Sequence, residues 1–234
     1  MRIPHWRPEI HMAICVVTGA NRGIGLELCR QLSERGDHVI AACRRTSPEL
    51  DGLGVEVVAG IDVGDSGSLQ RLTAVAGDRN IDLLINNAGI LRRDDLESID
   101  GDAIDEMIEQ FRVNSIGPIL VTRALAANMG AGSKVGIITS RMGSVTDNSS
   151  GGYYGYRMSK AAVNVAGKSL SIDLGKKGIS VFLLHPGYVQ TDMTSGQADV
   201  VPEVSVKGLL ERLDELGTRE TGSFWHAQGE PLPW

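Results

Sequence analysis

Short runs of apolar residues alternate with longer amphipathic segments along most of the chain. The apolar runs are rich in Val and Ile and do not alternate strictly with polar residues. This pattern is typical of parallel strands covered by helices on both faces of a sheet. The strands it predicts are Ile14–Thr18, His38–Cys43, Val55–Ile61, Ile81–Asn86, Lys134–Ser140 and Ile179–His185, with a short last strand near Phe224.

The segments between these strands have helical spacing. They predict helices at Gly23–Arg35, Ser66–Ala76, Ile104–Met129, Tyr153–Leu174 and Val204–Leu216. The last of these has a row of apolar residues on one face, as a helix that packs on a core does. Strands that alternate with helices predict an α/β fold, a single Rossmann-type doubly wound parallel sheet of about seven strands flanked by helices.

Nothing in the sequence divides the chain into two domains. It has 234 residues and neither an internal repeat nor a proline-rich linker, and single α/β domains reach this length. We therefore expect one domain over residues 12–234. Residues 1–11 show no periodicity before the strand-like run that follows Met12, so we expect an added extension or a disordered arm there.

Composition and charge narrow the range of partners. The formal net charge is −6, so the chain lacks the basic surplus that general nucleic-acid binding needs. No apolar run approaches the roughly 20 residues that cross a bilayer, and no signal-peptide pattern opens the chain. The three cysteines are widely separated and offer no metal or redox pair. We expect a cytoplasmic protein with a small-molecule substrate, no membrane partner and no metal.

A glycine-rich turn connects the first predicted strand to the first predicted helix. Gly19, Gly23 and Gly25 lie in the segment "VVTGANRGIG". Glycines in this context let the backbone turn sharply and approach a pyrophosphate, whose charge the N-terminus of the helix stabilises. The segment therefore predicts a dinucleotide site.

The residues after the second predicted strand indicate which dinucleotide binds. An acidic residue there would bind a bare ribose 2′-hydroxyl, but this chain has Arg44 and Arg45, and Arg22 lies in the glycine turn. We predict NADP(H), with Arg22 and Arg44 holding the 2′-phosphate through charge-assisted hydrogen bonds. The alternative is that these arginines are solvated surface charges.

Four motifs in order along the chain resemble those of the classical short-chain dehydrogenase/reductase family. They are the glycine loop Thr18–Gly25, the N-N-A-G segment Asn86–Gly89, the Y-x-x-x-K segment Tyr156–Lys160 and the P-G-x-V-x-T segment Pro186–Thr191. Within the family, "SRMGSVTDNSSGGYYGYRMSKAAVN" and the ending "FWHAQGEPLPW" resemble the branch of sniffer-type carbonyl reductases and bacterial C-factor proteins.

The resemblance implies a set of cofactor-binding residues. These are Gly19, Asn21, Arg22, Gly23, Ile24, Gly25, Arg44, Asp62, Val63, Asn87, Ala88, Gly89, Tyr156, Lys160, Pro186, Gly187, Val189 and Thr191. Asp62 would lie near the adenine ring, and helix capping before Ser66 is the alternative reading of its carboxylate.

Three tyrosines lie close together in "GGYYGYRMSK", and only one has the right register for chemistry. Residues four apart share a helix face, so Lys160 lies beside Tyr156, while Tyr153 and Tyr154 are out of register and more typical of packing. A phenol titrates near 10. We expect the Lys160 ammonium to lower the pKa of Tyr156 by stabilising the phenolate, which would make Tyr156 the general acid.

The resemblance also implies two polar partners for Tyr156. Ser140, at the end of the fifth predicted strand, would orient a substrate carbonyl, and Ser144 is the competing serine. Asn114 would hold a water that relays protons between Lys160 and solvent. The alternative is that Asn114 merely distorts the long predicted helix ahead of a glycine and a proline.

Other polar residues are interpreted without a catalytic role. His185 precedes Pro186 at a strand end, which favours a structural position. The run of Arg92, Arg93, Asp94 and Asp95 is typical of a solvated charge cluster. Residues 194–202 are small and polar, and they predict a mobile lid over the site.

These features together predict an NADPH-dependent carbonyl reductase with Asn114, Ser140, Tyr156 and Lys160 as its catalytic set. A dinucleotide-binding signalling protein of the C-factor type is one alternative, and an NADP-dependent alcohol dehydrogenase working in the oxidative direction is another. The family resemblance implies a homodimer or homotetramer formed through the long helices.

Overall fold

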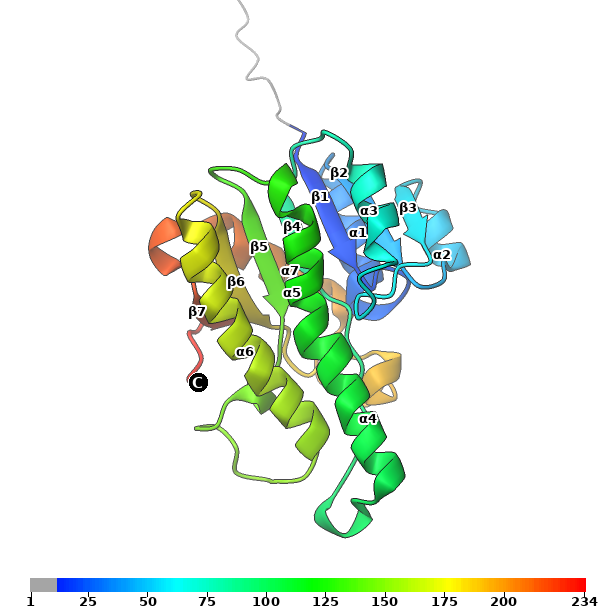
Figure 1. Ribbon diagram of the computed structural model, residues 1–234, viewed down its shortest axis with the longest axis vertical. Coiled ribbons are helices and arrows are strands. Elements are labelled where there is room, and N and C mark those ends of the chain that lie inside the picture. The colour runs from blue at the N-terminus through cyan, green and yellow to red at the C-terminus, as the bar shows by residue number, and fades with distance from the viewer. Residues whose placement is uncertain (1–11) are drawn as a thin grey trace, which may run out of the picture.

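A seven-stranded parallel sheet forms the centre of the computed structural model, which describes residues 12–234 (Figure 1). The strand order is β3-β2-β1-β4-β5-β6-β7, and every neighbouring pair is parallel. The predicted doubly wound α/β fold is confirmed. The interpretation of residues 1–11 lies outside the described residues. The strands are β1 (Ile14–Thr18), β2 (His38–Cys43), β3 (Glu56–Ala59), β4 (Leu83–Asn86), β5 (Lys134–Ile138), β6 (Ser180–His185) and β7 (Ser223–His226).

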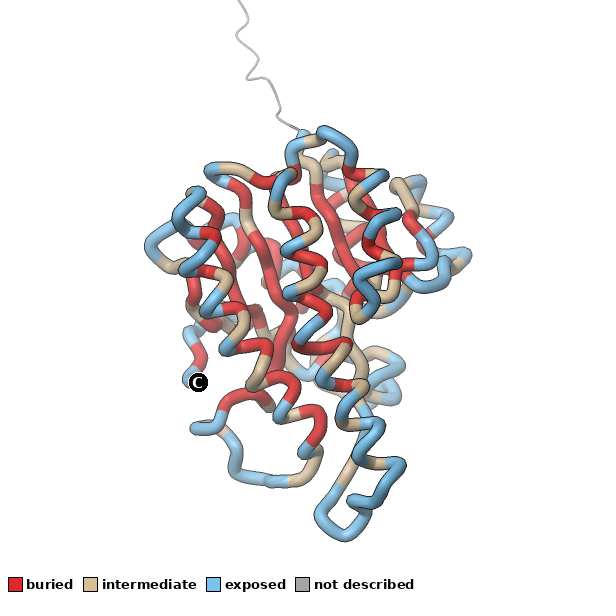
Figure 2. Tube along the Cα trace, in the orientation of Figure 1, coloured by how far each residue is buried: buried red, intermediate tan, exposed pale blue. Residues whose placement is uncertain are grey.

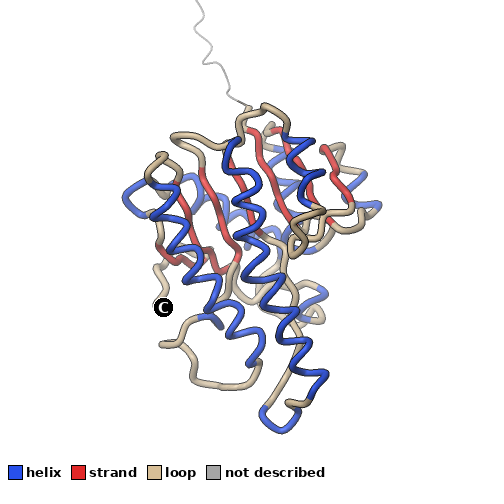
Figure 3. Tube along the Cα trace, viewed as in Figure 1, coloured by secondary structure: helices blue, strands red, loops and turns tan. Residues whose placement is uncertain are grey.

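Helices cover both faces of this sheet (Figures 1 and 3). On one face lie α1 (Gly23–Glu34) and α7 (Pro202–Glu215), and on the other lie α3 (Leu69–Ala76), α5 (Gly117–Leu125) and α6 (Tyr154–Gly175). The helix α4 (Gly101–Phe111) packs along α6, and both project beyond the sheet at the edge where the strands end. A single turn, α2 (Pro48–Asp51), was not predicted because it is too short to show a period.

Most buried side chains of the strands lie in two separate cores, and Leu183 and Phe224 form a smaller third cluster with Leu232. In β1, Cys15 and Val17 pack with Leu28 of α1 and Leu209 of α7, whereas Val16 packs in the second core under α3, α5 and α6. Because both faces are covered, the central residues of most strands are apolar on both sides, as the sequence pattern indicated. Figure 2 shows the resulting buried layer through the sheet.

The long helix predicted at Ile104–Met129 is interrupted. After α4 the chain forms a π-helical segment at Arg112–Ile116, and α5 then begins at Gly117. Pro118 explains the break, because it has no N–H to donate to the carbonyl of Asn114 and its ring collides with that carbonyl in a regular helix. The distortion considered for Asn114 is therefore present, and it leaves the Asn114 side chain buried among α4, α5 and α6.

The order of the strands reverses direction at β1 and β4. The chain moves outward from β1 through β2 to β3, then returns to form β4 on the other side of β1. The connections after β1 and β4 therefore lead to opposite sides of the sheet, and the switch point at the carboxyl edge is where ligands bind in open α/β sheets. Within residues 12–234, no helix is long and apolar enough to cross a membrane.

Candidate active site

The turn between β1 and α1 is built so tightly that it requires glycine. Gly19 has a φ of +66°, and a Cβ there would lie 2.8 Å from the Cα of Ala88. A Cβ on Gly25 would lie 2.1 Å from the carbonyl oxygen of Gly19. These contacts leave bare backbone and the N-terminus of α1 facing the switch point, as binding of a pyrophosphate requires.

The loop after β4 is locked onto this turn. The Oγ1 of Thr18 accepts hydrogen bonds from the backbone N–H groups of Asn87 and Ala88 at 3.0 and 3.1 Å. In return, the Asn87 Nδ2 donates to the carbonyl of Thr18 at 3.0 Å. The T-G and N-N-A-G segments, which are far apart in the sequence, therefore form one rigid floor.

A cavity of about 770 Å³ lies over this floor. The predicted cofactor residues that line it are Gly19, Asn21, Arg22, Gly23, Ile24, Gly25, Arg44, Asp62, Val63, Asn87, Ala88, Gly89, Tyr156, Lys160, Pro186 and Thr191. Gly187 and Val189 are not among the residues that line it in the described chain. Val189 is buried and forms a β-bridge to Val200. It therefore stabilises the loop after β6 and does not line the cavity.

Other lining residues were not foreseen from the motifs. They are Cys43, Arg45, Ile61, Ile90, Val113, Ile138, Thr139, Asp192 and Met193. Ile90, Thr139 and Asp192 immediately follow a strand or a motif residue, and Cys43 and Ile138 end a strand. Their position in the sequence therefore contained the signal, because residues at the carboxyl ends of parallel strands converge at one edge.

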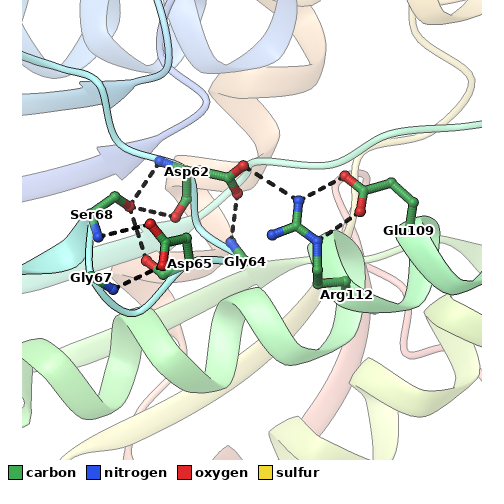
Figure 4. Close-up of polar contacts among 7 residues, drawn as sticks. All are labelled: Asp62, Gly64, Asp65, Gly67, Ser68, Glu109 and Arg112. Carbon is green, nitrogen blue, oxygen red and sulfur yellow. Dashed lines mark hydrogen bonds and ion pairs between the residues drawn. The ribbon is translucent and has the colours of Figure 1, made fainter.

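Asp62 lines the cavity and is held by its own turn and by Arg112, which directly follows α4 (Figure 4). Its Oδ1 accepts from the Gly64 N–H at 2.9 Å, and its Oδ2 lies 3.4 Å from Nη2 of Arg112, which also binds Glu109. The carboxylate that caps the turn before α3 belongs instead to Asp65. The capping alternative for Asp62 is therefore wrong.

Three arginines line the same cavity. Arg44 and Arg45 are exposed at the end of β2, and Arg22 comes from the glycine turn. The Nη1 of Arg22 forms an exposed ion pair with Oδ2 of Asp192 at 3.0 Å, which connects the glycine turn to the loop after β6. This concentration of guanidinium groups suits a phosphate.

Ser140 lies just beyond β5, which ends two residues earlier than predicted. Its Oγ accepts from the Met142 N–H at 3.1 Å and begins a 3₁₀ turn at Arg141–Gly143. A Cβ on Gly143 would lie 2.7 Å from the backbone of Lys160, so the turn rests directly on α6. Ser140 is in this way brought within hydrogen-bond reach of Tyr156. Ser144 instead accepts from the N–H of Asp147 at 3.2 Å.

Tyr156 and Lys160 lie on one face of α6, as their spacing indicated. The Lys160 Nζ is 5.7 Å from the centre of the Tyr156 ring and donates to the carbonyl of Ile138 at 3.0 Å. Both side chains are buried and line the cavity. Tyr153 precedes the helix with a φ of +53°, and Tyr154 is 36% exposed, so neither shares this face.

Residues 13–200 match the family described as short chain dehydrogenase. The chain belongs to this family. A curated relative, the 1-hydroxy-2-glutathionyl-2-methyl-3-butene dehydrogenase of Rhodococcus sp. (strain AD45), is 39% identical over 95% of this chain and 100% of its own. The C-signal protein of Myxococcus xanthus is 43% identical over 66% of this chain and 93% of its own.

Solved structures of carbonyl reductases have the same fold. The carbonyl reductase Sniffer of D. melanogaster is 30% identical, with a TM-score of 0.87 over 96% of this chain and 100% of that chain. A carbonyl reductase from Pseudomonas aeruginosa PAO1 in complex with NADP is 31% identical, with a TM-score of 0.83 over 95% and 100%. The family resemblance of the motifs is thus confirmed, and this short chain dehydrogenase is an oxidoreductase.

The protonation of the Tyr156–Lys160 pair differs from the expectation. Burial raises the pKa of Tyr156 to about 12, and the hydrogen bond with Ser140 opposes this only in part. Burial also lowers the pKa of Lys160 to about 8. The pKa of Tyr156 in this short chain dehydrogenase is therefore raised and not lowered, contrary to the expectation. Tyr156 instead keeps its proton at neutral pH, as a proton donor must.

Asn114 connects three segments around this pair. Its Nδ2 donates to the carbonyl of Ile90 at 2.8 Å and to Oγ of Ser159 at 3.0 Å, and its Oδ1 accepts from the Ile90 N–H at 2.8 Å. A buried amide needs partners at both ends, and Asn114 has them. It is not itself among the residues that line the cavity in the described chain.

The interpretation of residues 92–95 as a solvated charge cluster is wrong for Asp94. Its carboxylate accepts from the backbone N–H groups of Tyr154 and Gly155, which begin α6. Asp95 caps the following 3₁₀ turn at Leu96–Ser98. A sequence pattern does not distinguish one charged residue from its charged neighbours. Asp94 differs from them because it binds the start of a distant helix.

His185 is expected to make the protein less stable as the pH falls. Burial lowers its pKa to about 3, and the nearby His226, Arg141 and Lys160 act in the same direction. Its Nδ1 is buried and has no hydrogen-bond partner in the described chain. Because the unfolded chain takes up the proton near pH 6.5, stability is lost as the pH falls from about 6.5 towards 3, by at most about 1.4 kcal/mol per pH unit.

Denaturant unfolding of the unmodified protein and of His185→Gln at several pH values would measure this contribution. The variant should show the shallower pH dependence between pH 6.5 and 4, because its side chain does not titrate. Equal slopes in the two proteins would contradict the assignment to His185.

Proposed function

We propose that this short chain dehydrogenase is an NADPH-dependent carbonyl reductase in which Tyr156 is the proton donor. The observation that carries the proposal is that Tyr156 and Lys160 line one cavity with the glycine turn and three arginines. A dinucleotide and a reactive carbonyl can therefore meet beside a protonated phenol.

The residues present fit the cofactor. The glycine turn offers backbone that any Cβ would fill, and Arg22, Arg44 and Arg45 offer charge for a 2′-phosphate. Asp62 would hold the adenine end, and Lys160 and Thr191 would hold the nicotinamide half. When bound, NADPH supplies a hydride for the substrate carbon.

The side chains of this protein would then perform the remaining chemistry. Ser140 donates a hydrogen bond to the carbonyl oxygen and holds it near Tyr156. Tyr156 transfers its hydroxyl proton to that oxygen as negative charge develops there. The Lys160 ammonium would stabilise the resulting phenolate. Asn114 would hold the water that relays protons between Lys160 and solvent.

The reductive direction needs Tyr156 in its protonated form. A phenol whose pKa is raised to about 12 carries its proton at neutral pH, as carbonyl reduction requires, whereas alcohol oxidation uses the phenolate as a base. The Rhodococcus relative is named a dehydrogenase, so oxidation of a glutathionyl alcohol is the second direction to assay.

A signalling role is the second candidate function. The identity with C-signal, 43% over 157 residues, supports a protein that binds a dinucleotide and acts through another molecule. The complete set of Ser140, Tyr156 and Lys160 supports catalysis instead, because binding alone does not need a positioned phenol.

We also propose that the protein forms a homo-oligomer through α4 and α6. Ile104, Ile108, Val165 and Ile172 are 49% to 70% exposed on these helices, and apolar side chains of this size favour burial against another chain.

An NADPH-oxidation screen over aldehydes, ketones and quinones tests the proposal, together with an NADP⁺-reduction assay on glutathionyl alcohols and NADPH binding followed by fluorescence. Binding with steady turnover of a carbonyl is the expected result. Binding without turnover of any carbonyl or glutathionyl alcohol would favour the signalling role, and absence of binding would reject both.

Replacing Arg44 with Asp should shift cofactor preference towards NADH. The substitution removes hydrogen bonds to the 2′-phosphate and adds repulsion, so the ratio of kcat/KM for NADPH to that for NADH should fall about 10- to 100-fold. Steady-state kinetics with both cofactors measures the ratio. Arg93→Asp is the matched control, because Arg93 is exposed and outside the cavity lining. An unchanged ratio in Arg44→Asp would place the phosphate elsewhere.

A further inference from the structure

The helix that contains Tyr156 begins without a cap from its own sequence. The N-cap residue of α6 is Tyr153, which makes no side-chain cap bond within the described chain. The first intrahelical hydrogen bond is that from the Arg157 N–H to the carbonyl of Tyr153 at 2.8 Å. The preceding amides of the first turn therefore need partners from elsewhere.

Asp94 supplies these partners from 60 residues earlier in the chain. One carboxylate oxygen accepts from the Tyr154 N–H, and the other accepts from the Gly155 N–H at 3.0 Å. The carbonyl of Asp94 also accepts from the Tyr153 N–H at 2.8 Å. Three consecutive amides, ending one residue before Tyr156, are thus held by one residue. The negative carboxylate also suits the positive end of the helix dipole.

Asp94 is itself held in place by the segment to which it belongs. We call residues 90–94 the strap, because it connects the N-N-A-G loop to the start of α6. The N–H and C=O of Ile90 bind Asn114, and the Arg92 N–H donates to Oε1 of Gln110 at 2.9 Å. Gln110 is completely buried. The strap is therefore fixed at alternate residues before it reaches α6.

The packing of α4 against α6 leaves little freedom for this arrangement. A Cβ on Gly155 would lie 2.6 Å from both the Nε2 of Gln110 and the Cγ of Met107. The chain also enters α6 through Tyr153 in the left-handed region, with a φ of +53°. That conformation is unfavourable for a residue with a side chain, so the hydrogen bonds that Asp94 accepts from this turn help to maintain it.

We propose that Asp94 is a positioning residue, which sets the place of the Tyr156 hydroxyl relative to Ser140 by fixing the first turn of α6. The proposal rests on the proposed function for its kinetic consequence. Lys160 lies one turn further along and has a separate anchor at the carbonyl of Ile138. Loss of the carboxylate should therefore displace Tyr156 more than Lys160 or the cofactor residues.

The test compares Asp94→Ala and Asp94→Asn with Asp95→Ala. The neighbouring Asp95 caps only the turn at Leu96–Ser98, so it controls for the loss of a capping carboxylate in the same loop. Asp94→Ala should lower kcat about 10- to 100-fold, because a displacement of about 1 Å has this cost, with KM for NADPH unchanged. Asp94→Asn keeps one acceptor oxygen and should recover part of the loss. Asp95→Ala should keep the kcat of the unmodified protein.

Hydrogen exchange of the backbone amides at residues 153–156 gives a second readout that needs no substrate. Exchange should be about fivefold faster in Asp94→Ala than in the unmodified protein, as loss of a helix cap predicts, and unchanged in Asp95→Ala. Equal exchange in the two variants, or an equal effect on kcat, would overturn the positioning role. If the unmodified protein reduces no carbonyl, the proposed function fails, and the exchange data still decide whether Asp94 fixes this turn.

Discussion

Replacing Tyr156 with Phe is expected to reduce kcat for carbonyl reduction by about a hundredfold to ten-thousandfold, the range for loss of a general acid. The substitution removes only the hydroxyl, and the ring continues to fill its place on the buried face of α6. The fold and the glycine turn are unaffected, so the dissociation constant of NADPH should change little. Steady-state turnover and fluorescence titration measure the two quantities separately.

Tyr154→Phe is the matched control for this experiment. It removes the same atom from the same turn of α6, but the Tyr154 side chain is 36% exposed and does not line the cavity. We expect its kcat to equal that of the unmodified protein. Substantial turnover by Tyr156→Phe, or equal losses in the two variants, would reject Tyr156 as the proton donor.

Replacing Ser140 with Ala is expected to have the second largest effect, a loss of about a hundredfold to a thousandfold in kcat, as for removal of one donor to a developing oxyanion. The hydroxyl of Ser140 is within hydrogen-bond reach of Tyr156, so it can hold a carbonyl oxygen near the phenol. Binding of NADPH should persist, because Ser140 is not among the cavity-lining residues.

Ser144→Ala separates the chemistry of Ser140 from its structural role. Ser140 and Ser144 are both buried, and each accepts one backbone N–H in its own turn. Either substitution should therefore cost about 1 kcal/mol of unfolding free energy, whereas only Ser140→Ala should lose turnover. A larger loss of kcat in Ser144→Ala would assign the carbonyl-binding role to Ser144.

The helix interruption and the role of Asp94 show two different limits of sequence reading. The signal for the interruption was present, because Pro118 is incompatible with a regular helix through Asn114, and the predicted helix passed over it. For Asp94 no local signal existed, because its partners are amides 60 residues later. A backbone N–H group leaves no trace in a residue pattern.

Local sequence was enough to determine the order of strands and helices, the glycine turn and the shared face of Tyr156 and Lys160. These features depend on contacts within a few residues, on short continuous apolar runs and on the helical period of 3.6. Tertiary structure decided the binding of the strap to α6, the position of Asp62 and the pKa of Tyr156. Each of these depends on which distant groups surround a side chain. At Tyr156 burial outweighs the hydrogen bond with Ser140, because the cost of removing a charge from water is set by the whole environment and not by one neighbour.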